Sequence, residues 1–141
     1  MGLRELLHRL TTPKRFSEAY VRDLGEVKLI CVVNHGLKMG KGKIAAQVGH
    51  ASVKAALTIK DTSPALFEAW IRSGQQKVVL KATDVDEIKS LLDKAKSVGL
   101  STHRIRDAGR TQIPAGSLTV GVIGPAQCEL IDELTGNLKL L

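Results

Sequence analysis

Four polar side chains recur at helical spacing in the segment that follows a glycine-rich turn. They are Lys43, Gln47, His50 and Lys54, separated by four, three and four residues. On an α-helix this spacing places all four side chains on one face. Taken singly, a helical lysine or glutamine is usually a solvated side chain, and a lone histidine is often a satisfied boundary residue. Together they can present hydrogen-bond donors to a ligand.

A second group of polar residues lies in DAGRTQIPAGSLTV, a predicted loop between two predicted strands. Asp107 and Thr111 bracket Gly109 and Arg110 there. A carboxylate can orient or deprotonate a water, a hydroxyl can position that water, and an arginine can clamp a phosphate. The alternative is an ordinary turn, in which Asp107 caps its own backbone and Gly109 supplies a positive φ. The residues alone leave both interpretations open.

The glycine-rich turn before the first group is similar to a nucleotide phosphate loop but does not match it. Gly36 and Gly42 are six residues apart rather than five, and Ile44 stands where the Walker motif needs serine or threonine. What remains is a predicted helix N-terminus with Lys41 and Lys43, whose free backbone amides can bind a phosphate or a developing oxyanion. Nucleotide hydrolysis is therefore not expected.

No metal or other cofactor is expected from the sequence. The two cysteines, Cys31 and Cys128, lack metal-ligand spacing and are too few for a disulfide framework. We expect both to be buried free thiols, as free cysteine usually is. The four histidines are too dispersed to indicate a metal site.

Alternating segments predict the elements that must position these polar groups. Short β-branched apolar runs predict strands, and segments with an apolar stripe at helical spacing predict helices. The expected strands are 27–33, 76–81, 103–106 and 118–123, and the expected helices are 43–59, 64–72, 83–97 and 125–134. Ser63 is the expected N-cap of the second helix, and Thr83 with Asp86 marks the start of the third. Strands that alternate with helices indicate an α/β sandwich.

The length of the chain indicates the number of domains, and its charge indicates the class of partner. A chain of 141 residues is near the modal size of one domain, and no stretch approaches the length of a membrane helix. We therefore expect a cytoplasmic protein with no membrane partner. The net charge is +7, and residues 27–60 hold six lysines and no acidic residue, which favours a nucleic acid. Only four residues are aromatic, so contact with backbone phosphates is favoured over base stacking.

The first 26 residues look different from the rest and predict an N-terminal arm, 1–26. Leu3, Leu6, Leu7 and Leu10 fall on one helical face before Pro13 interrupts it. We expect this amphipathic arm to pack on the domain or on a neighbouring subunit rather than on a membrane surface, because it is short and carries mixed charges.

Several motifs, taken together and in order, resemble the type II peptidyl-tRNA hydrolases, a family shared by archaea and eukaryotes. The resemblance covers residues 27–141 and rests on KMGKGKIAAQVGHA at 38–51, DAGRTQI at 107–113, GSLTV at 116–120, IGP at 123–125 and TGNLKL at 135–140. It implies hydrolysis of the ester between a nascent peptide and the 3′-terminal ribose of tRNA. It also implies a three-layer α/β/α sandwich with a mixed sheet of about four strands, commonly as a homodimer.

The resemblance implies a catalytic set without a metal or cofactor. By position, the residues that match the family's proposed active site are Lys43, Gln47, His50, Asp107 and Thr111. In our hypothesis Asp107, aided by Thr111, activates the water, Lys43 stabilises the oxyanion, and Gln47 and His50 position the acyl group or ribose. The expected tRNA-backbone contacts are Lys38, Lys41, Lys54 and Arg110.

The chain departs from the family pattern in two places. The family usually has a basic and an acidic residue where this chain has Asn34 and Gly36, and Pro114-Ala115 reverses the more usual order. The first departure motivates an alternative function, a non-catalytic RNA-binding or scaffolding module on the same fold. The second is expected to alter the loop backbone, because proline fixes φ and restricts the residue before it.

Overall fold

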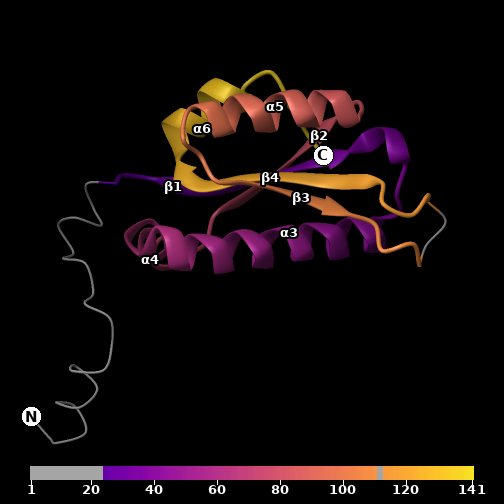
Figure 1. The fold of residues 1–141 in the computed structure, drawn as a ribbon. Coiled ribbons are helices and arrows are strands. Elements are labelled where there is room, and N and C mark those ends of the chain that lie inside the picture. The colour runs from indigo at the N-terminus through magenta and orange to yellow at the C-terminus, as the bar shows by residue number, and fades with distance from the viewer. Residues whose placement is uncertain (1–23, 111–112) are drawn as a thin grey trace, which may run out of the picture.

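The fold is a sheet covered by helices on both faces (Figure 1). The structure, a computed structural model, describes residues 24–110 and 113–141. On one face lie α3 (Lys41–Thr62) and α4 (Pro64–Arg72), and on the other lie α5 (Val85–Ser97) and α6 (Cys128–Thr135). A short 3-10 helix, η1 (His35–Leu37), joins the first strand to α3. This is the expected three-layer α/β/α sandwich.

The sheet is mixed and has five strands rather than about four. Its order is β3 (Thr102–Arg106), β4 (Leu118–Gln127), β1 (Val27–Asn34), β2 (Lys77–Ala82) and β5 (Lys139–Leu140). β1 and β2 are parallel, and the other neighbouring pairs are antiparallel. The added strand, β5, has two residues, too few to show the alternation by which strands are recognised in a sequence.

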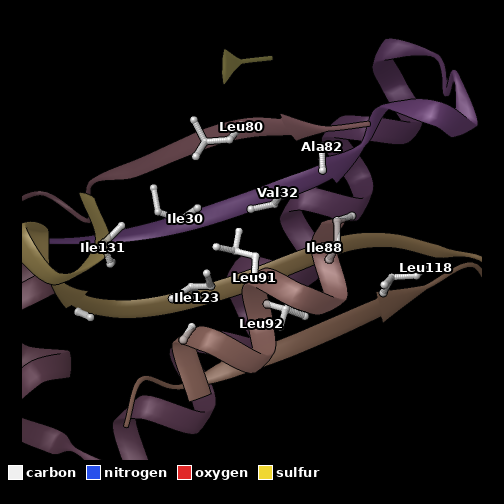
Figure 2. Packing of buried hydrophobic residues seen from close by; sticks show 12 residues of the cluster. Ile30, Val32, Leu80, Ala82, Ile88, Leu91, Leu92, Leu118, Ile123 and Ile131 are labelled. Carbon is white, nitrogen blue, oxygen red and sulfur yellow. The ribbon is translucent and has the colours of Figure 1, made fainter. Parts of the chain in front are cut away.

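β1 is central, and its side chains alternate between two hydrophobic layers. Val27, Leu29, Cys31 and Val33 pack under α3 and α4, whereas Ile30 and Val32 pack under α5 and α6. Figure 2 shows this second layer, where Leu91 and Leu92 of α5 and Ile131 of α6 meet side chains of the sheet. A strand buried on both faces explains why its sequence is an almost unbroken apolar run.

The strand directions bring the chemically interesting segments to one edge. Because β4 runs antiparallel to both β1 and β3, the C-terminal ends of β1, β2 and β3 lie at the same edge of the sheet. The first turn of α3 and the loop after β3 lie at that edge too (Figure 1). Loops at the carboxyl ends of strands are where α/β sheets usually collect ligands.

The start of the last helix was predicted wrongly. The sequence placed Pro125 in its first turn, but Pro125 lies in β4, and α6 begins at Cys128. β4 continues to Gln127 because Ala126 and Gln127 pair with β1, and the register shifts opposite Pro125. Such an irregularity needs no amide hydrogen from the proline, so a proline is tolerated there.

The remaining boundaries agree with expectation to within a few residues, with two differences at the helix caps. Ser63 precedes Pro64 as expected, but its side chain makes no capping hydrogen bond. α5 is capped by Asp84 instead of Thr83, since the Asp84 carboxylate accepts from the Glu87 amide at 2.9 Å.

The predicted arm, 1–26, lies outside the described residues except for its last three. Leu24 packs against the α3 layer, and its carbonyl accepts from Gln127 Nε2 at 3.0 Å. Among the helices of residues 24–110 and 113–141, none is long and apolar enough to cross a membrane.

Candidate active site

The structure brings Lys43 and Asp107 together from segments 64 residues apart. Lys43 lies in the first turn of α3, and Asp107 directly follows β3. The Lys43 ammonium donates a hydrogen bond to Asp107 Oδ1 and forms an ion pair with it. The Asp107 side chain is only 1% exposed and that of Lys43 is 19% exposed. The Asp107 carboxylate is therefore shielded from bulk solvent, and the pair is reached from the side of the Lys43 ammonium.

A tight turn fixes the orientation of the Asp107 carboxylate. Its Oδ2 accepts a hydrogen bond from the Gly109 amide at 2.9 Å. Its backbone amide donates to the Ser117 carbonyl at 2.9 Å, and its carbonyl accepts from the Gly116 amide at 3.0 Å. Gly109 has a φ of 82°, which favours glycine. The ordinary-turn interpretation therefore holds, and the same turn also aims a carboxylate at a lysine.

Gln47 follows Lys43 by one turn of α3 and is buried. Its side chain belongs to the helix face that packs on the sheet, and the residue is 6% exposed. Its Oε1 has no hydrogen-bond partner among the described residues. An unpartnered buried acceptor usually costs about 1 to 3 kcal/mol of stability, so a native one calls for an explanation.

His50 and Lys54 lie farther along α3 and do not join the ion pair. Both are exposed, and helix rise places them about 10 Å and about 16 Å beyond Lys43 along the axis. Lys54 instead lies close enough to His103 of β3 to affect it: burial, and secondly the Lys54 charge, lower the pKa of His103. The Ser101 hydroxyl is 3.2 Å from His103 Nε2.

His103 is a residue at this surface that the sequence reasoning missed. It alternates with Ile105 along β3, and Ile105 packs in the α3 layer, so both side chains face α3. Asp107 continues the same alternation two residues later. This period of two was the signal that could have placed His103 beside the helix.

The four expected tRNA contacts are all exposed side chains. Lys38 follows η1, Lys41 is the first residue of α3, Lys54 lies in the fourth turn of α3, and Arg110 lies in the loop after Asp107. None of the four makes an ion pair within the part of the chain that the structure describes. The first turn of α3 has no acidic residue and no side-chain cap, so its amides are open to an anion.

Thr111, expected to aid Asp107, lies outside the described residues.

The structure shows where the two departures from the family pattern lie. Asn34 is buried, and its Nδ2 donates to the Leu118 carbonyl at 3.0 Å, which ties the end of β1 to the start of β4. Pro114 begins a turn in which its carbonyl accepts from the Ser117 amide at 3.2 Å and from the Ser117 hydroxyl at 2.7 Å.

Gly36 is held against the neighbouring loop. A Cβ at this position would lie 2.7 Å from the Thr83 carbonyl oxygen, closer than such atoms approach. The chain therefore has no space for an acidic side chain at position 36 in this loop conformation.

The cysteines carry no sign of redox or metal chemistry in the described residues. Both are free; Cys31 is buried as expected, and Cys128 is partly buried. Burial raises the pKa of the Cys31 thiol to about 11. Across residues 24–110 and 113–141, no three His, Cys, Asp or Glu side chains gather in a way that could hold a metal ion.

Comparison with known proteins identifies relatives of this chain. A protein named "Peptidyl-tRNA hydrolase 2, mitochondrial" from Bos taurus is 50% identical over 133 residues, which cover 94% of this chain and 74% of that protein. The protein of the same name from Homo sapiens is 52% identical over 118 residues, covering 84% of this chain and 66% of that protein. A "Peptidyl-tRNA hydrolase" from Methanocaldococcus jannaschii is 46% identical over 115 residues, covering 82% of this chain and all of that protein. The family model described as "Peptidyl-tRNA hydrolase PTH2" matches residues 27–141, which include every polar residue placed above, and the chain belongs to that family.

Proposed function

We propose that this protein hydrolyses the ester between a nascent peptide and the 3′-terminal ribose of tRNA, releasing free tRNA and peptide. The observation that carries the proposal is the Lys43–Asp107 pair, held at the ligand-binding edge of the sheet beside the open N-terminus of α3. Membership of the PTH2 family and the names of relatives about 50% identical support it.

Asp107 acts as the group that activates water. Ester hydrolysis needs a base that removes a proton as the water attacks the carbonyl carbon. The hydrogen bond from the Gly109 amide and the ion pair with Lys43 hold the carboxylate in one orientation, so little reorganisation is needed at the moment of attack. Thr111 is proposed to position that water.

Lys43 stabilises the negative charge that develops on the carbonyl oxygen. An ammonium group has three donors, so the bond to Asp107 Oδ1 leaves two for the substrate. The uncapped amides of the first turn of α3 add the positive end of the helix dipole at the same place. The proton taken by Asp107 then passes to the ribose oxygen as that oxygen leaves.

Gln47 and His50 position the substrate. The unpartnered Oε1 of Gln47 is suited to accept a hydrogen bond from a ribose hydroxyl or from a peptide amide. A substrate donor bound to this oxygen would supply its missing hydrogen bond. The free-energy cost of a buried acceptor without a partner would then no longer apply, which favours substrate binding. The exposed His50, two turns from Lys43, is placed to contact a more distant part of the acyl group or ribose.

The exposed cations Lys38, Lys41, Lys54 and Arg110 hold the tRNA backbone. They are spread along the loop before α3, along α3 itself and across the loop after β3, as contact with several phosphates of one strand requires. A Lys38→Ala/Lys41→Ala/Lys54→Ala variant is expected to lose part of the salt dependence of tRNA affinity, and an unchanged slope would move the tRNA site elsewhere.

Assembly and location are proposed as a homodimer in the cytoplasm. An exposed apolar pair on α3, Val53 and Leu57 (60% and 61% exposed), offers a surface for a second copy. Light scattering of Leu57→Glu beside the wild type tests the dimer.

The bovine and human relatives are named mitochondrial, so fractionation of cells expressing the full-length protein tests the location.

The decisive experiment is release of the blocked amino acid from N-acetyl-aminoacyl-tRNA. Wild type is compared with Lys43→Ala and Asp107→Asn, with unblocked aminoacyl-tRNA as the control substrate. Hydrolysis of the blocked substrate that falls in both variants supports the proposal. No hydrolysis by wild type, together with salt-sensitive tRNA binding, would instead indicate a binding module on the same fold. Activity is expected to survive a chelator.

A further inference from the structure

A groove of about 430 Å³ lies between η1, the end of β2 and β5. It is at the same end of the molecule as the first turn of α3 and the loop after β3, which hold the Lys43–Asp107 pair (Figure 1). Its lining includes three lysines, Lys38, Lys81 and Lys139, and one acidic residue, Glu87. Lys139 lies in the TGNLKL motif and Lys81 at the end of the expected strand 76–81, but the sequence analysis gave neither lysine a role.

The charges of this groove are unbalanced. Glu87 already accepts a hydrogen bond from the Thr83 amide at 2.7 Å, as part of the cap of α5. Among the described residues none of the three lysines forms an ion pair. The lining therefore holds three lysines without an ion-pair partner among the described residues, and its single carboxylate already accepts a backbone hydrogen bond.

Two of the lysines face each other in a way that costs stability. Lys81 of β2 and Lys139 of β5 are directly opposite in the antiparallel pair, so their side chains share one face of the sheet. Like charges directly opposite each other in a strand pair repel and destabilise it. Lys38 is also unfavourably placed, since its φ of 50° is left-handed backbone that lysine rarely adopts. Such local costs are typical of sites that bind a ligand.

We propose that this groove binds phosphates of the tRNA backbone, as a second contact region beside the active site. The inference rests on the proposed function, because the occupant is the substrate's own polyanion. A phosphodiester relieves the Lys81–Lys139 repulsion directly, and the lining holds no Phe, Tyr or Trp side chain, so apart from the imidazole of His35 it offers no ring on which a base could stack.

The distance suits one bound strand. Lys81 pairs with Val33 of β1, Val33 with Val120 of β4, and Val120 with Ile105 of β3, two residues before Asp107. Three strand spacings separate Lys81 from Ile105, or about 14 Å. A tRNA strand whose 3′ end reaches Asp107 therefore has phosphates within reach of Lys81 and of Lys139 on the neighbouring strand.

The test is the salt dependence of binding to deacylated tRNA. Lys81→Gln/Lys139→Gln is compared with Lys94→Gln/Lys96→Gln, which removes the same charge from exposed positions at the far end of α5. Each phosphate contact contributes about 0.7 to 0.9 to the slope of log affinity against log salt. Raising the salt from about 50 to about 200 mM lowers the affinity of the wild type for tRNA. We expect this loss of affinity to be about tenfold smaller in the groove variant and to equal that of the wild type in the control variant.

Thermal unfolding separates binding from folding. The groove variant is expected to be at least as stable as the wild type, because a repulsive pair has been removed. If the double variant fails to fold, the single variant Lys139→Gln is used instead, because Lys139 lies on the exposed edge strand. Its expected change in salt slope is half that of the double variant. An unchanged slope, or equal slopes for groove and control variants, overturns the inference.

Wild-type hydrolysis of N-acetyl-aminoacyl-tRNA is measured on the same preparation. If the wild type hydrolyses the substrate and the groove variant has an unchanged salt slope, the proposed function is supported and the groove is refuted as a tRNA contact. A changed slope without hydrolysis keeps the groove as an RNA site and removes the proposed function.

Discussion

Breaking the Lys43–Asp107 pair from either side is expected to give unequal losses of stability. Lys43→Met leaves a carboxylate that is 1% exposed without its ammonium partner, and such a loss usually costs about 3 to 5 kcal/mol. Asp107→Asn leaves an ammonium whose side chain is 19% exposed and can turn toward water, so we expect about 1 to 3 kcal/mol. The asymmetry follows from the two exposures alone.

The double variant Lys43→Met/Asp107→Asn removes both charges of the ion pair. We expect it to be about 2 kcal/mol less destabilised than the sum of the single variants. Urea denaturation of all four proteins measures this coupling, and hydrolysis of N-acetyl-aminoacyl-tRNA is measured beside it. Each single variant is expected to lose about 10² to 10⁴-fold in kcat, and the double variant is expected to regain stability without regaining activity.

Two results would refute this reasoning. Additive stability losses would show that the two side chains do not interact in solution. Asp107→Asn with wild-type turnover would remove Asp107 as the base, whatever its effect on stability. Lys94→Met, an exposed lysine of α5 outside every site discussed, is the matched control for a lost ammonium group.

Three further predictions address individual side chains. Gln47→Leu replaces a buried orphan acceptor with an apolar group of similar size, so the free energy of unfolding is expected to rise by about 1 kcal/mol while hydrolysis falls; a variant that gains stability and keeps full activity would contradict a substrate contact. The folded-state pKa of Cys31 is about 11 against 9.0, so its thiol favours folding below pH 9, and about 2 to 3 kcal/mol is lost as the pH rises from 9 to 11; urea denaturation of wild type and Cys31→Ala across that range tests it. Lys54→Gln is expected to raise the pKa of His103 toward its ordinary value without restoring it, because burial is the larger cause; an NMR titration that shows no shift would separate the two residues.

Much of the fold was predictable because its elements carry strong local patterns. β1 is an apolar run buried on both faces, and α4 spans the expected residues, where Pro64 opens the helix and the chain turns at Gly74 with a φ of 99°. The errors fall where pairing between distant segments decides the structure. The local sequence around Pro125 is typical of a helix start, but pairing with β1 extends β4 past this residue. The two residues of β5 form a strand through their pairing with β2.

The candidate site was predictable in part for the same reason. Helical spacing grouped Lys43 with Gln47, and the family resemblance grouped Asp107 with them. Spacing could not reveal that Gln47 is buried with an unpartnered acceptor, or that His103 lies beside Lys54. The pairing of Lys81 with Lys139 was also hidden, because it depends on the register of a two-residue strand.

The contact between Gly36 and the Thr83 carbonyl constrains how this sequence can change. Any side chain at position 36 must first displace a backbone atom 2.7 Å from its Cβ, so the loop that holds Thr83 has to move before an aspartate can enter. The two loops are therefore coupled: a carboxylate at 36 is expected to fit only when the 83–84 turn has also shifted. A single Gly36→Asp exchange in this chain is expected to be a poor route to the family's common sequence, and a chimera that exchanges both loops together is the productive one.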